Sequence, residues 1–407
     1  MDLAAFIHSS AFRESARCEP RFFTRNRILT FPQLIVFLLS GVRGAVQAEL
    51  DAFFALLQQR TKLVRVVTAA AFSKARSHLF ATTFDAVNSE LLRLIEHSVG
   101  IPRWCGLRVL AADGTKVRLT LLDKEGRRTI RELFALALFM PDMELFESMT
   151  LDPVGNERQV LFEQLDRLNP QDLLVLDRGY PAAWLVSVLL ARGINFCMRC
   201  ESSSTFKAVT HFMRSGQSEA IVTLPPPNRS DAADYGCPRT PSKVRLIRDV
   251  TPEGTVRVLM TSLLDATSYP ASAFSALYHG RWRIEEAYKR IKHRLNLEHT
   301  SGLTWLAAQQ DIGAKIICDN LNALAAFLAT GEHIPVESKH RINRTLAFNN
   351  IRRLLPRALA LRIVGYKTFA EALAEIAKNL QTFVKNRRRP RPPQPKPHKS
   401  HAYKPGV

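Results

Sequence analysis

The sequence predicts an α/β protein in which helices flank a mixed sheet, with further helical regions before and after it. Residues 1–105 and 301–384 have helical periodicity, whereas residues 106–300 combine short apolar strands with helices. Strands that alternate with helices usually build a sheet with helices on its faces. A chain of 407 residues has room for two or three such structural units.

The first 105 residues are expected to form a helical domain. Thr30 before Pro32 is a helix start signal, and Gly41 ends the apolar stripe that follows. The polar remainder of this region is rich in arginine and lysine. Such a domain is either a DNA-binding module of the helix-turn-helix type or a packing domain with a charged surface. The net charge of the chain favours contact with DNA.

After residue 105 the pattern changes to apolar strands. Residues 107–112 form a strand that we expect to enter a turn at Asp113-Gly114. Residues 117–122 and 133–139 are expected as further strands of the same sheet. An acidic residue therefore follows a buried strand at Asp113.

A second buried strand also ends at an acid. Residues 172–176 are a continuous apolar run, typical of a strand buried on both faces, and Asp177-Arg178-Gly179 follows it. Helical patterns over 156–168 and 182–191 stand before and after this strand. Another strand is expected at 194–199, and the alternation indicates a mixed sheet.

Residues 200–265 interrupt that alternation. Pro225-Pro226-Pro227 and Thr251-Pro252-Glu253-Gly254 are turn signals. The stretches expected as strands between and beside them are 220–224, 243–247 and 256–259. We therefore expect a β-rich insertion at about 200–265.

One continuous helix is expected from Ala271 to Leu295, because Gly280 is its only glycine and it contains no proline. At about 100° per residue, four functional residues fall within an arc of roughly 60°: Tyr278, Arg281, Glu285 and Lys292. Glu286 points roughly 100° away and is the weaker candidate for the same role. The ordinary alternative is a solvated charged helix, whose charges need no common face.

The formal charge of +20 implies an extended polyanion as partner, either nucleic acid or an anionic membrane surface. The tail at 385–407 holds eight Lys or Arg and no acid, so we expect it to be mobile. Its use is either non-specific phosphate binding or solubility. The N-terminus lacks a secretory signal, and the apolar segment 31–39 is too short to span a bilayer. We expect a cytoplasmic protein without a membrane partner.

The acids at the strand ends are candidate metal ligands. An ionised side chain at the end of a buried strand is costly unless something compensates it. If the two strands are neighbours, Asp113 and Asp177 emerge at one edge of the sheet, and Glu285 on a helix beside that edge completes the site. Three carboxylates suit Mg²⁺ or Mn²⁺. Two such ions can activate an attacking water or 3′-hydroxyl in phosphodiester chemistry.

Each acid also has an ordinary explanation. Asp113 in an Asp-Gly sequence is often a turn residue. Asp177 could cap the helix that starts near Pro181. Glu285 could pair with Arg281 or Lys289 at helical spacing. All three explanations must hold together for the catalytic interpretation to fail.

The four residues on the expected helix carry a family resemblance. The spacing of Tyr278, Arg281, Glu285 and Lys292 resembles the Tyr-Arg-Glu-Lys signature of the DDE transposases of the IS-four insertion-sequence family. Arg281-Trp282-x-Ile284-Glu285 strengthens the match. The family's first and second acidic motifs are similar to Asp113-Gly114-Thr115 and Asp177-Arg178-Gly179-Tyr180. The resemblance covers most of residues 20–300.

The resemblance implies an RNase H-like catalytic core over 106–300, with the β-rich insertion between the second acid and the glutamate. It implies that Asp113, Asp177 and Glu285 are the catalytic residues and the ligands of two Mg²⁺ or Mn²⁺ ions. Tyr278, Arg281 and Lys292 would hold the DNA backbone near the cleavage point, and Arg178 in the second motif is a further DNA-binding candidate.

The implied reaction is metal-dependent cleavage at the ends of a mobile DNA element, followed by attack of the 3′-hydroxyl ends on target DNA. The implied partners are double-stranded DNA, as terminal inverted repeats and target, and a second subunit in a homodimeric synaptic complex. The implied location is the bacterial cytoplasm, at the nucleoid.

Two other functions remain compatible with the same residues. One is a metal-dependent nuclease or resolvase that cuts without joining. The other is a catalytically silent DNA-binding protein derived from a transposase, against which the intact set of three acids argues.

Overall fold

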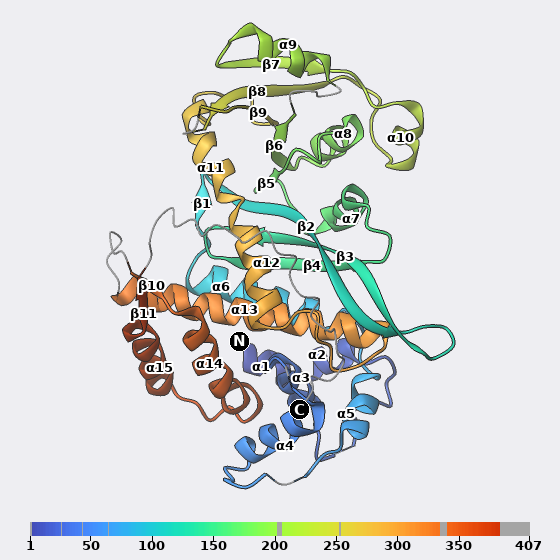
Figure 1. Cartoon of the computed structure of the whole chain (residues 1–407), viewed down its shortest axis with the longest axis vertical. Helices are drawn as coiled ribbons and strands as arrows, with labels where there is room; N and C mark the ends of the chain where they lie inside the picture. The colour runs from blue at the N-terminus through green and yellow to red at the C-terminus, as the bar shows by residue number, and fades with distance from the viewer. Residues whose placement is uncertain are drawn as a thin grey trace, which may run out of the picture. The chain divides into compact units, whose positions relative to one another are not determined.

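The computed structural model describes residues 2–25, 27–42, 44–63, 65–201, 206–251, 254–333 and 340–382, apart from the side chains of 331–333. The chain divides into two compact units (Figure 1). The sheet unit comprises residues 101–116 and 134–288. The helical unit comprises residues 1–100, 117–133 and the described residues from 289 onward. The basic tail expected at 385–407 lies outside the described residues.

A nine-stranded mixed sheet confirms the predicted α/β fold class. Its strand order is β4-β3-β2-β5-β6-β9-β8-β7, with β1 paired to β2 off this path. The parallel pairs β2–β5 and β5–β6, beside the antiparallel pair β3–β4, are consistent with the RNase H-like core that the resemblance implied. The strands are β1 (Arg103–Trp104), β2 (Leu107–Leu122), β3 (Arg128–Met140), β4 (Leu145–Asp152), β5 (Asp172–Leu176), β6 (Asn195–Cys200), β7 (Glu219–Leu224), β8 (Ser242–Val250) and β9 (Val256–Thr261).

The strands expected within 200–265 extend this same sheet. β9 pairs antiparallel with β6, β8 with β9, and β7 with β8. Two helices, α9 (Lys207–Ser215) and α10 (Arg229–Asp234), interrupt these strands along the chain. The inserted segment is β-rich as predicted, and it widens the core sheet instead of forming a sheet of its own.

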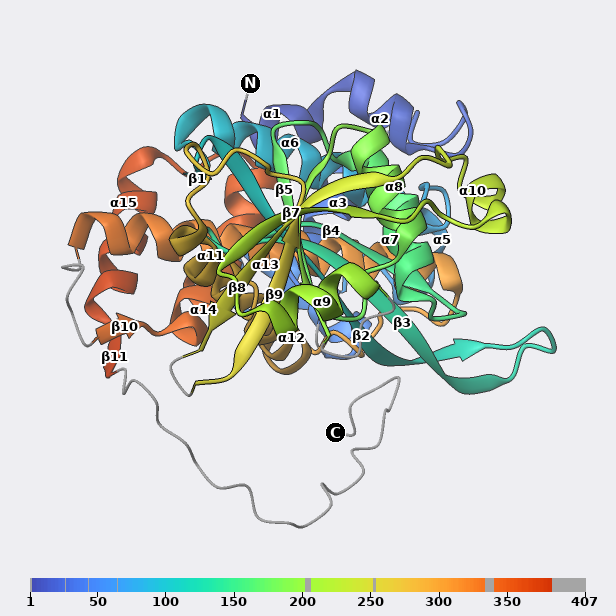
Figure 2. The ribbon, with the colours of Figure 1, turned by 90° about the horizontal axis from the view of Figure 1, so that it is seen from above.

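Helices cover both faces of the sheet. α11 (Phe274–Gly280) packs on one face, where Tyr278 shares an apolar cluster with Val175 of β5 and other alternate strand residues. α7 (Glu157–Gln164) and α8 (Ala183–Ala191) lie on the other side, as two perpendicular views show (Figures 1 and 2). The sheet is therefore buried between helical layers, as the continuous apolar run of β5 predicted.

The turn expected at Asp113-Gly114 is wrong, because β2 runs without a break from Leu107 to Leu122. A Cβ atom on Gly114 would stand 2.1 Å from Cζ of Phe134 on β3. Glycine therefore serves the close approach of a neighbouring side chain here and not a turn. The segment expected as a separate strand at 117–122 is the second half of β2.

The continuous helix expected from Ala271 to Leu295 is also wrong. After the short turn η2 (Ala271–Ala273), α11 ends at Gly280 and α12 (Arg283–Arg294) begins beyond a break. Around the break, the amide groups of residues 281, 282, 284 and 285 donate to carbonyl oxygens three residues back, which is the tighter 3₁₀ pattern. Gly280, with its low helix propensity, stands where the regular helix stops.

The helical unit is organised around one long helix. α13 (Trp305–His333) contacts α3, α6, α14 and α15. By length and composition alone, its stretch Trp305–Thr330 could cross a membrane, but 72% of the apolar window is buried inside the structure, as in a core helix. The other elements of the unit are α1 (Leu3–His8), α2 (Ser10–Ala16), α3 (Phe31–Leu39), α4 (Val46–Leu57), α5 (Ala69–Arg76), α6 (Thr83–Ser98), α14 (Arg344–Leu355), η3 (Pro356–Ala360), α15 (Tyr366–Lys378) and the paired strands β10 (His340–Ile342) and β11 (Leu380–Thr382).

The start of α3 follows the predicted signals. The Thr30 side chain accepts a hydrogen bond from the Gln33 amide, and the Gln33 side chain accepts one from the Thr30 amide, which is a complete capping box. The helix ends at Leu39, and Gly41 adopts a left-handed conformation (φ 68°) that ends such helices.

A buried charge network joins the N-terminal and C-terminal helices. Arg76 of α5 is 3% exposed, and its Nη2 donates to Asp311 Oδ1 of α13 at 3.0 Å. Its Nε donates to Gln310 Oε1 at 3.0 Å. A buried charge is tolerated only when it is paired and hydrogen-bonded. The two helical regions that we expected as separate domains are therefore parts of one folded unit.

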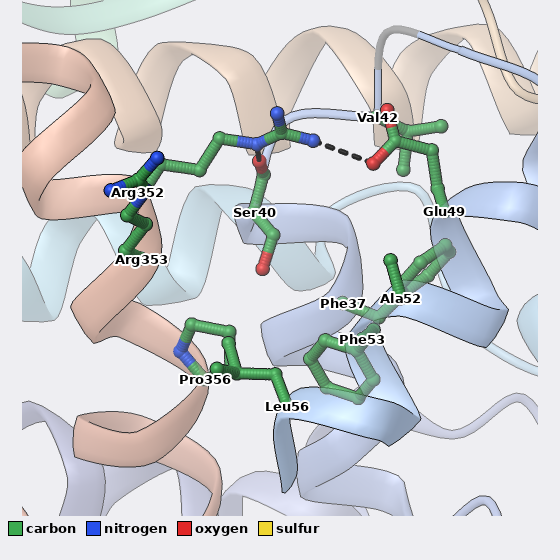
Figure 3. A pocket seen from close by; sticks show the side chains of 10 residues that line it. All are labelled: Phe37, Ser40, Val42, Glu49, Ala52, Phe53, Leu56, Arg352, Arg353 and Pro356. Carbon is green, nitrogen blue, oxygen red and sulfur yellow. Dashed lines mark hydrogen bonds and ion pairs between the residues drawn. The ribbon is translucent and has the colours of Figure 1, made fainter. Parts of the chain in front are cut away.

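A cavity of about 230 Å³ lies where α3, α4 and α14 meet (Figure 3). Arg352 donates from Nη2 to Glu49 Oε2 at 2.6 Å and from Nε to the Ser40 carbonyl oxygen at 2.7 Å. The remaining lining includes the apolar side chains of Phe37 and Phe53. We interpret this cavity as a packing junction, since Arg352 is paired with Glu49 and Arg353, the second arginine of the lining, is exposed.

Candidate active site

The strands that carry the two aspartates are parallel neighbours, as the metal-site hypothesis requires. Arg108 to Ala111 of β2 pair with Asp172 to Val175 of β5. Asp113 and Asp177 each stand two residues beyond the last of these pairs. Parallel strands present their carboxyl ends at the same edge of a sheet, where such folds bind ligands.

An ion-pair network fixes the register of β2 on β5. Arg108 Nε donates to Asp172 Oδ1 at 2.6 Å, and Nη2 donates to Oδ2 at 2.9 Å. Nη1 reaches Glu147 Oε2 of β4 at 3.0 Å. A bidentate pair of this kind constrains both distance and angle. It therefore holds the two aspartate-bearing strands in one alignment.

Arg281 links the first aspartate to the glutamate. Its Nη1 lies 3.7 Å from Asp113 Oδ1, and its Nη2 lies 3.7 Å from Glu285 Oε1. The break between α11 and α12 places Arg281 at the junction, while Glu285 lies in the first turn of α12. The Arg281–Glu285 pairing weighed as an ordinary explanation is thus present, but the same guanidinium also faces Asp113.

Three other carboxylates act on the Asp113 carboxyl. Burial raises the pKa of the Asp113 carboxyl to about 7, and the charge of Arg281 opposes that rise. The negative charges of Glu157, Asp177 and Glu285 raise it further. One guanidinium therefore faces more negative charge than it can neutralise, and a divalent cation would relieve the excess.

Arg281 has hydrogen-bonding capacity left over. The residue is 5% exposed, and its Nε and Nη1 atoms are buried without a hydrogen-bond partner in the described structure. Buried guanidinium N–H groups are normally satisfied. Phosphate oxygens match the forked geometry of these donors, so Arg281 is suited to a phosphodiester.

Tyr278 lies beneath this arginine and not at the surface. It is 1% exposed, and the guanidinium carbons of Arg257 and Arg281 lie 5.2 and 5.8 Å from its ring centroid. Burial raises the pKa of its hydroxyl, and Arg281 opposes the rise. The sequence pattern placed Tyr278 at the DNA; in this structure its ring supports Arg281 from the core.

The other two DNA-binding candidates interact with acids outside the predicted metal-ligand set. Arg178 has a side chain 59% exposed and pairs with Glu201 at 3.2 Å. Lys292 stands two turns beyond Glu285 on α12, in the part assigned to the helical unit, where burial lowers its pKa and Glu298 opposes the change. Glu286 is exposed, whereas Glu285 is half-buried and acts on Asp113, which favours Glu285 over its neighbour.

Glu157 is a fourth carboxylate of the cluster, and the sequence analysis missed it. Its Oε1 accepts a hydrogen bond from the Tyr180 hydroxyl at 2.9 Å. The same oxygen would stand 2.9 Å from a Cβ on Gly114, so it also lies beside the first acidic motif. Burial raises the pKa of Glu157 and the Tyr180 hydrogen bond opposes the rise. An acid in the first turn of a helix has an ordinary role at the helix dipole, which hid this one.

Tyr288 is a second residue that sequence reasoning missed. Its hydroxyl donates to the carbonyl oxygen of Asp113 and accepts from the Ala137 amide at 3.1 Å. It stands almost one turn after Glu285 on α12. The contact therefore locks the glutamate-bearing helix onto the strand that carries Asp113.

The donor set fits a hard divalent cation, although no three His, Cys, Asp or Glu of the described residues are arranged to hold one as they stand. The fit rests on donor chemistry: desolvated carboxylate oxygens gather on rigid elements, and the charge of Arg281 alone leaves Asp113 with a raised pKa. The residues that would hold an ion are Asp113, Asp177 and Glu285, with Glu157 beside them.

Asp177 does not have the helix-capping role that was its ordinary explanation. Its Oδ1 accepts a hydrogen bond from the Gly179 amide at 2.7 Å. The following helix α8 begins after Ala182, with no side-chain cap. Asp177 therefore shapes its own turn and does not cap that helix.

Parts of this chain are similar to known proteins. The sequence model of the family described as "Transposase DDE domain" matches residues 104–321. A transposase of Escherichia coli (strain K12), InsG of insertion sequence element IS4, is 25% identical over 245 residues, which cover 56% of this chain and 54% of that protein. The match thus spans about half the length of that relative. A solved piggyBac transposase synaptic complex with hairpin DNA aligns with a TM-score of 0.43 and 9% identity, over 92% of this chain and 84% of the other.

Proposed function

This chain belongs to the family of the transposase DDE domain, and from that premise we propose that it is an insertion-sequence transposase. It cuts DNA at the ends of its element and joins the freed 3′-hydroxyl ends to target DNA. The observation that carries this proposal is that Arg281, with buried donors that lack a hydrogen-bond partner, faces both Asp113 and Glu285, while the charge of Asp177 also acts on Asp113.

The three acids are the proposed ligands of two Mg²⁺ or Mn²⁺ ions. When bound, such ions supply activation of the attacking water or 3′-hydroxyl and stabilisation of the leaving oxygen. The protein's part is to fix the ligands: the Arg108–Asp172 pair sets the strand register, and Tyr288 holds Glu285 against β2. Glu157 lies beside these ligands. It accepts the hydrogen bond of Tyr180, and its negative charge raises the pKa of Asp113.

The scissile phosphodiester is held by Arg281. Its Nε and Nη1, which lack a hydrogen-bond partner, donate to phosphate oxygens, and the ring of Tyr278 keeps the guanidinium in place. Arg178, exposed on the loop after Asp177, contacts the backbone farther from the cut. Lys292 makes a further phosphate contact from the later turns of α12.

The proposed partners are double-stranded DNA with terminal inverted repeats, target DNA and a second copy of this chain in the synaptic complex. A formal charge of +20 suits a polyanion of this kind. We place the protein in the bacterial cytoplasm at the nucleoid, without a membrane partner.

The competing function is a metal-dependent nuclease, which would use the same acids to cut but would not join. A silent DNA-binding protein is disfavoured, because the charges of Glu157, Asp177 and Glu285 repel a partly buried Asp113 carboxylate unless a cation is held there.

The deciding experiment uses a supercoiled plasmid that carries the reading frame with its flanking DNA. Purified protein is added with Mg²⁺ or Mn²⁺, and excision and joining are read separately by primer extension and by product sequencing. Joined ends bounded by a short target duplication support the transposase. Cutting without joining supports the nuclease, and neither product with either metal would overturn both. Asp113→Asn, Asp177→Asn and Glu285→Gln are the matched inactive controls.

A further inference from the structure

A large cavity in the helical unit is lined by positive charge. It measures about 1050 Å³ and lies among α2, the segment 21–30 and α5. The cationic side chains around it are Arg13, Arg21, Arg25, Arg27 and Lys74. No Asp or Glu of the described residues lines it. Its size matches the upper end of ligand-binding cavities, so it can admit a group as large as a nucleotide.

The cations differ in what they already bind. Arg21 pairs with Glu19, Nε to Oε2 at 2.7 Å. Arg13 Nε, in contrast, is buried with no hydrogen-bond partner in the described structure. Arg27 and Lys74 are exposed at the cavity. A buried donor without an acceptor beside exposed cations indicates a place for an anionic oxygen.

One wall of the cavity is aromatic. The rings of Phe22 and His78 stack with centroids 3.7 Å apart and planes 5° apart, and Phe23 meets His78 edge-on at 6.2 Å. Burial lowers the pKa of His78, and the charges of Lys74, Arg27 and Arg21 lower it further against Glu19. The imidazole is therefore neutral near pH 7 and presents a flat, uncharged ring. Aromatic rings beside cations are how proteins hold a base and its phosphate together.

We propose that this cavity binds a nucleotide of a DNA strand, separately from the acid cluster. Arg13, Arg27 and Lys74 hold the phosphates, and the paired rings of Phe22 and His78 receive the base. The inference rests on the proposed function only in taking DNA as the ligand. It assigns the arginine-rich surface of the N-terminal helices one defined contact point.

The phosphate contacts are tested by salt dependence on the full chain. A labelled short duplex and the single strand of the same sequence are titrated by fluorescence anisotropy at several salt concentrations. For the duplex, each lost phosphate contact reduces the slope of log K against log salt by about 0.9. Arg27→Gln with Lys74→Gln should therefore reduce it by about 2.

The matched control is Arg60→Gln with Lys62→Gln, which removes the same charge from exposed positions of the helical unit outside the cavity. The control should change the slope less than the cavity pair does. Equal slopes for the two double variants would overturn the proposal. Arg27 and Lys74 are exposed, so their loss should leave the thermal melt unchanged; Arg13→Gln is a third variant, interpreted only if its melt matches the parent.

The base contact is tested by photo-cross-linking. DNA that carries 5-iodouracil is irradiated with the full chain, and the attached peptide is identified by mass spectrometry. The expected site is Phe22 or His78, and Phe22→Leu should lose most of the product. Cross-links confined to other peptides would overturn this part. Stronger cross-linking of the single strand places an unstacked base in the cavity; equal yields place a base of the intact duplex there.

Failure of this site and failure of the proposed function give different patterns. Asp113→Asn should lose cutting but keep both the salt slope and the cross-link. If the parent protein does not cut, but loss of Arg27 and Lys74 still reduces the slope of log K against log salt, the cavity assignment holds and the transposase proposal does not. A protein that cuts and joins while the cavity variants bind unchanged would remove the cavity assignment and keep the transposase.

Discussion

The Tyr180 hydroxyl donates a hydrogen bond to Glu157 Oε1 at 2.9 Å, which ties α7 to the loop that carries Asp177. Arg158 Nε donates to the Gly179 carbonyl oxygen at 2.9 Å and holds the same loop from the next residue. Glu157 also lies beside Gly114, so one helix start touches both acidic motifs.

Glu157→Gln should weaken metal binding. Glutamine keeps an oxygen for the Tyr180 hydroxyl but removes a negative charge that acts on Asp113. Loss of an outer partner of this kind costs about 10–100-fold in metal affinity. Titration calorimetry with Mn²⁺ measures the change. Glu163→Gln, an exposed position on the same helix, is the control, and an equal effect there would remove Glu157 from the site.

Asp113→Asn should stabilise the metal-free protein in a pH-dependent way. The folded pKa of Asp113 is about 7, above the unfolded value of about 3.9. A carboxyl whose folded pKa is raised stabilises the fold below its unfolded pKa and loses that contribution as pH rises through the folded pKa. In EDTA the variant should therefore match the parent near about pH 4 and exceed it by about 2–4 kcal/mol above about pH 7.

Urea unfolding at a series of pH values measures this difference. Excess Mg²⁺ should stabilise the parent at high pH and leave the variant nearly unchanged, because only the parent keeps the carboxylate ligand. A difference that stays constant across the pH range would contradict the raised pKa.

Arg281→Gln should reduce cutting at saturating DNA by at least about 100-fold. The reason is the loss of donors positioned for the phosphate, an effect of about 10²–10³ in comparable sites. Arg281→Lys retains the charge that faces Asp113 and Glu285 but lacks the fork, so it should fold and cut at an intermediate rate. Arg283→Gln, two residues along the chain and more exposed, should cut like the parent. Full activity of the lysine variant would mean that a point charge suffices.

Tyr288→Phe should cost about 1–3 kcal/mol of unfolding free energy, because it strands the Ala137 amide and the Asp113 carbonyl oxygen without their partner. Chemical denaturation measures the loss. Tyr366→Phe, at a residue 88% exposed, is the matched control and should be neutral. A neutral Tyr288 variant would show that α12 is held to β2 by other contacts.

Gly114→Ala should destabilise the sheet unit by about 1–3 kcal/mol or more through overpacking. The new Cβ would lie 2.1 Å from Phe134 Cζ and 2.9 Å from Glu157 Oε1. Thermal unfolding compares it with Gly114→Ala combined with Phe134→Leu, in which the shorter side chain makes room. Rescue by the second change is expected, and no rescue would assign the damage to Glu157 instead.

The strand-borne acids were predictable because two local signals coincide at each of them. The strand end expected before the acid is present at Asp177, since β5 ends at Leu176, but not at Asp113, because β2 continues to Leu122. The parallel register of β2 and β5 nevertheless places Asp113 and Asp177 at equivalent positions, two residues beyond the last pair. Glu285 was predictable from its spacing to Arg281, since the i, i+4 relation survives the break just before α12.

The features that escaped prediction depend on contacts distant in sequence. Glu157 meets Tyr180 across 23 residues, and Tyr288 meets Ala137 across 151. Asp113-Gly114 suggested a turn because the local sequence does not show that the Phe134 side chain of β3 packs closely against Gly114. The association of the N-terminal and C-terminal helices likewise depends on contacts distant in sequence, among them the buried Arg76–Asp311 pair and the Arg352–Glu49 pair.

That buried arginine bears on the order in which the chain can fold during synthesis. Arg76 leaves the ribosome 235 residues before Asp311, its buried partner. Chains fold unit by unit as they emerge. Most of the sheet unit lies in the sequence between the two main parts of the helical unit, so it can fold first. The arginine-rich N-terminal helices complete their packing only after α13 has been synthesised. A nascent or truncated chain would therefore hold the acid cluster before it holds a finished helical unit, and the DNA contacts proposed for that unit would form only when translation is nearly complete.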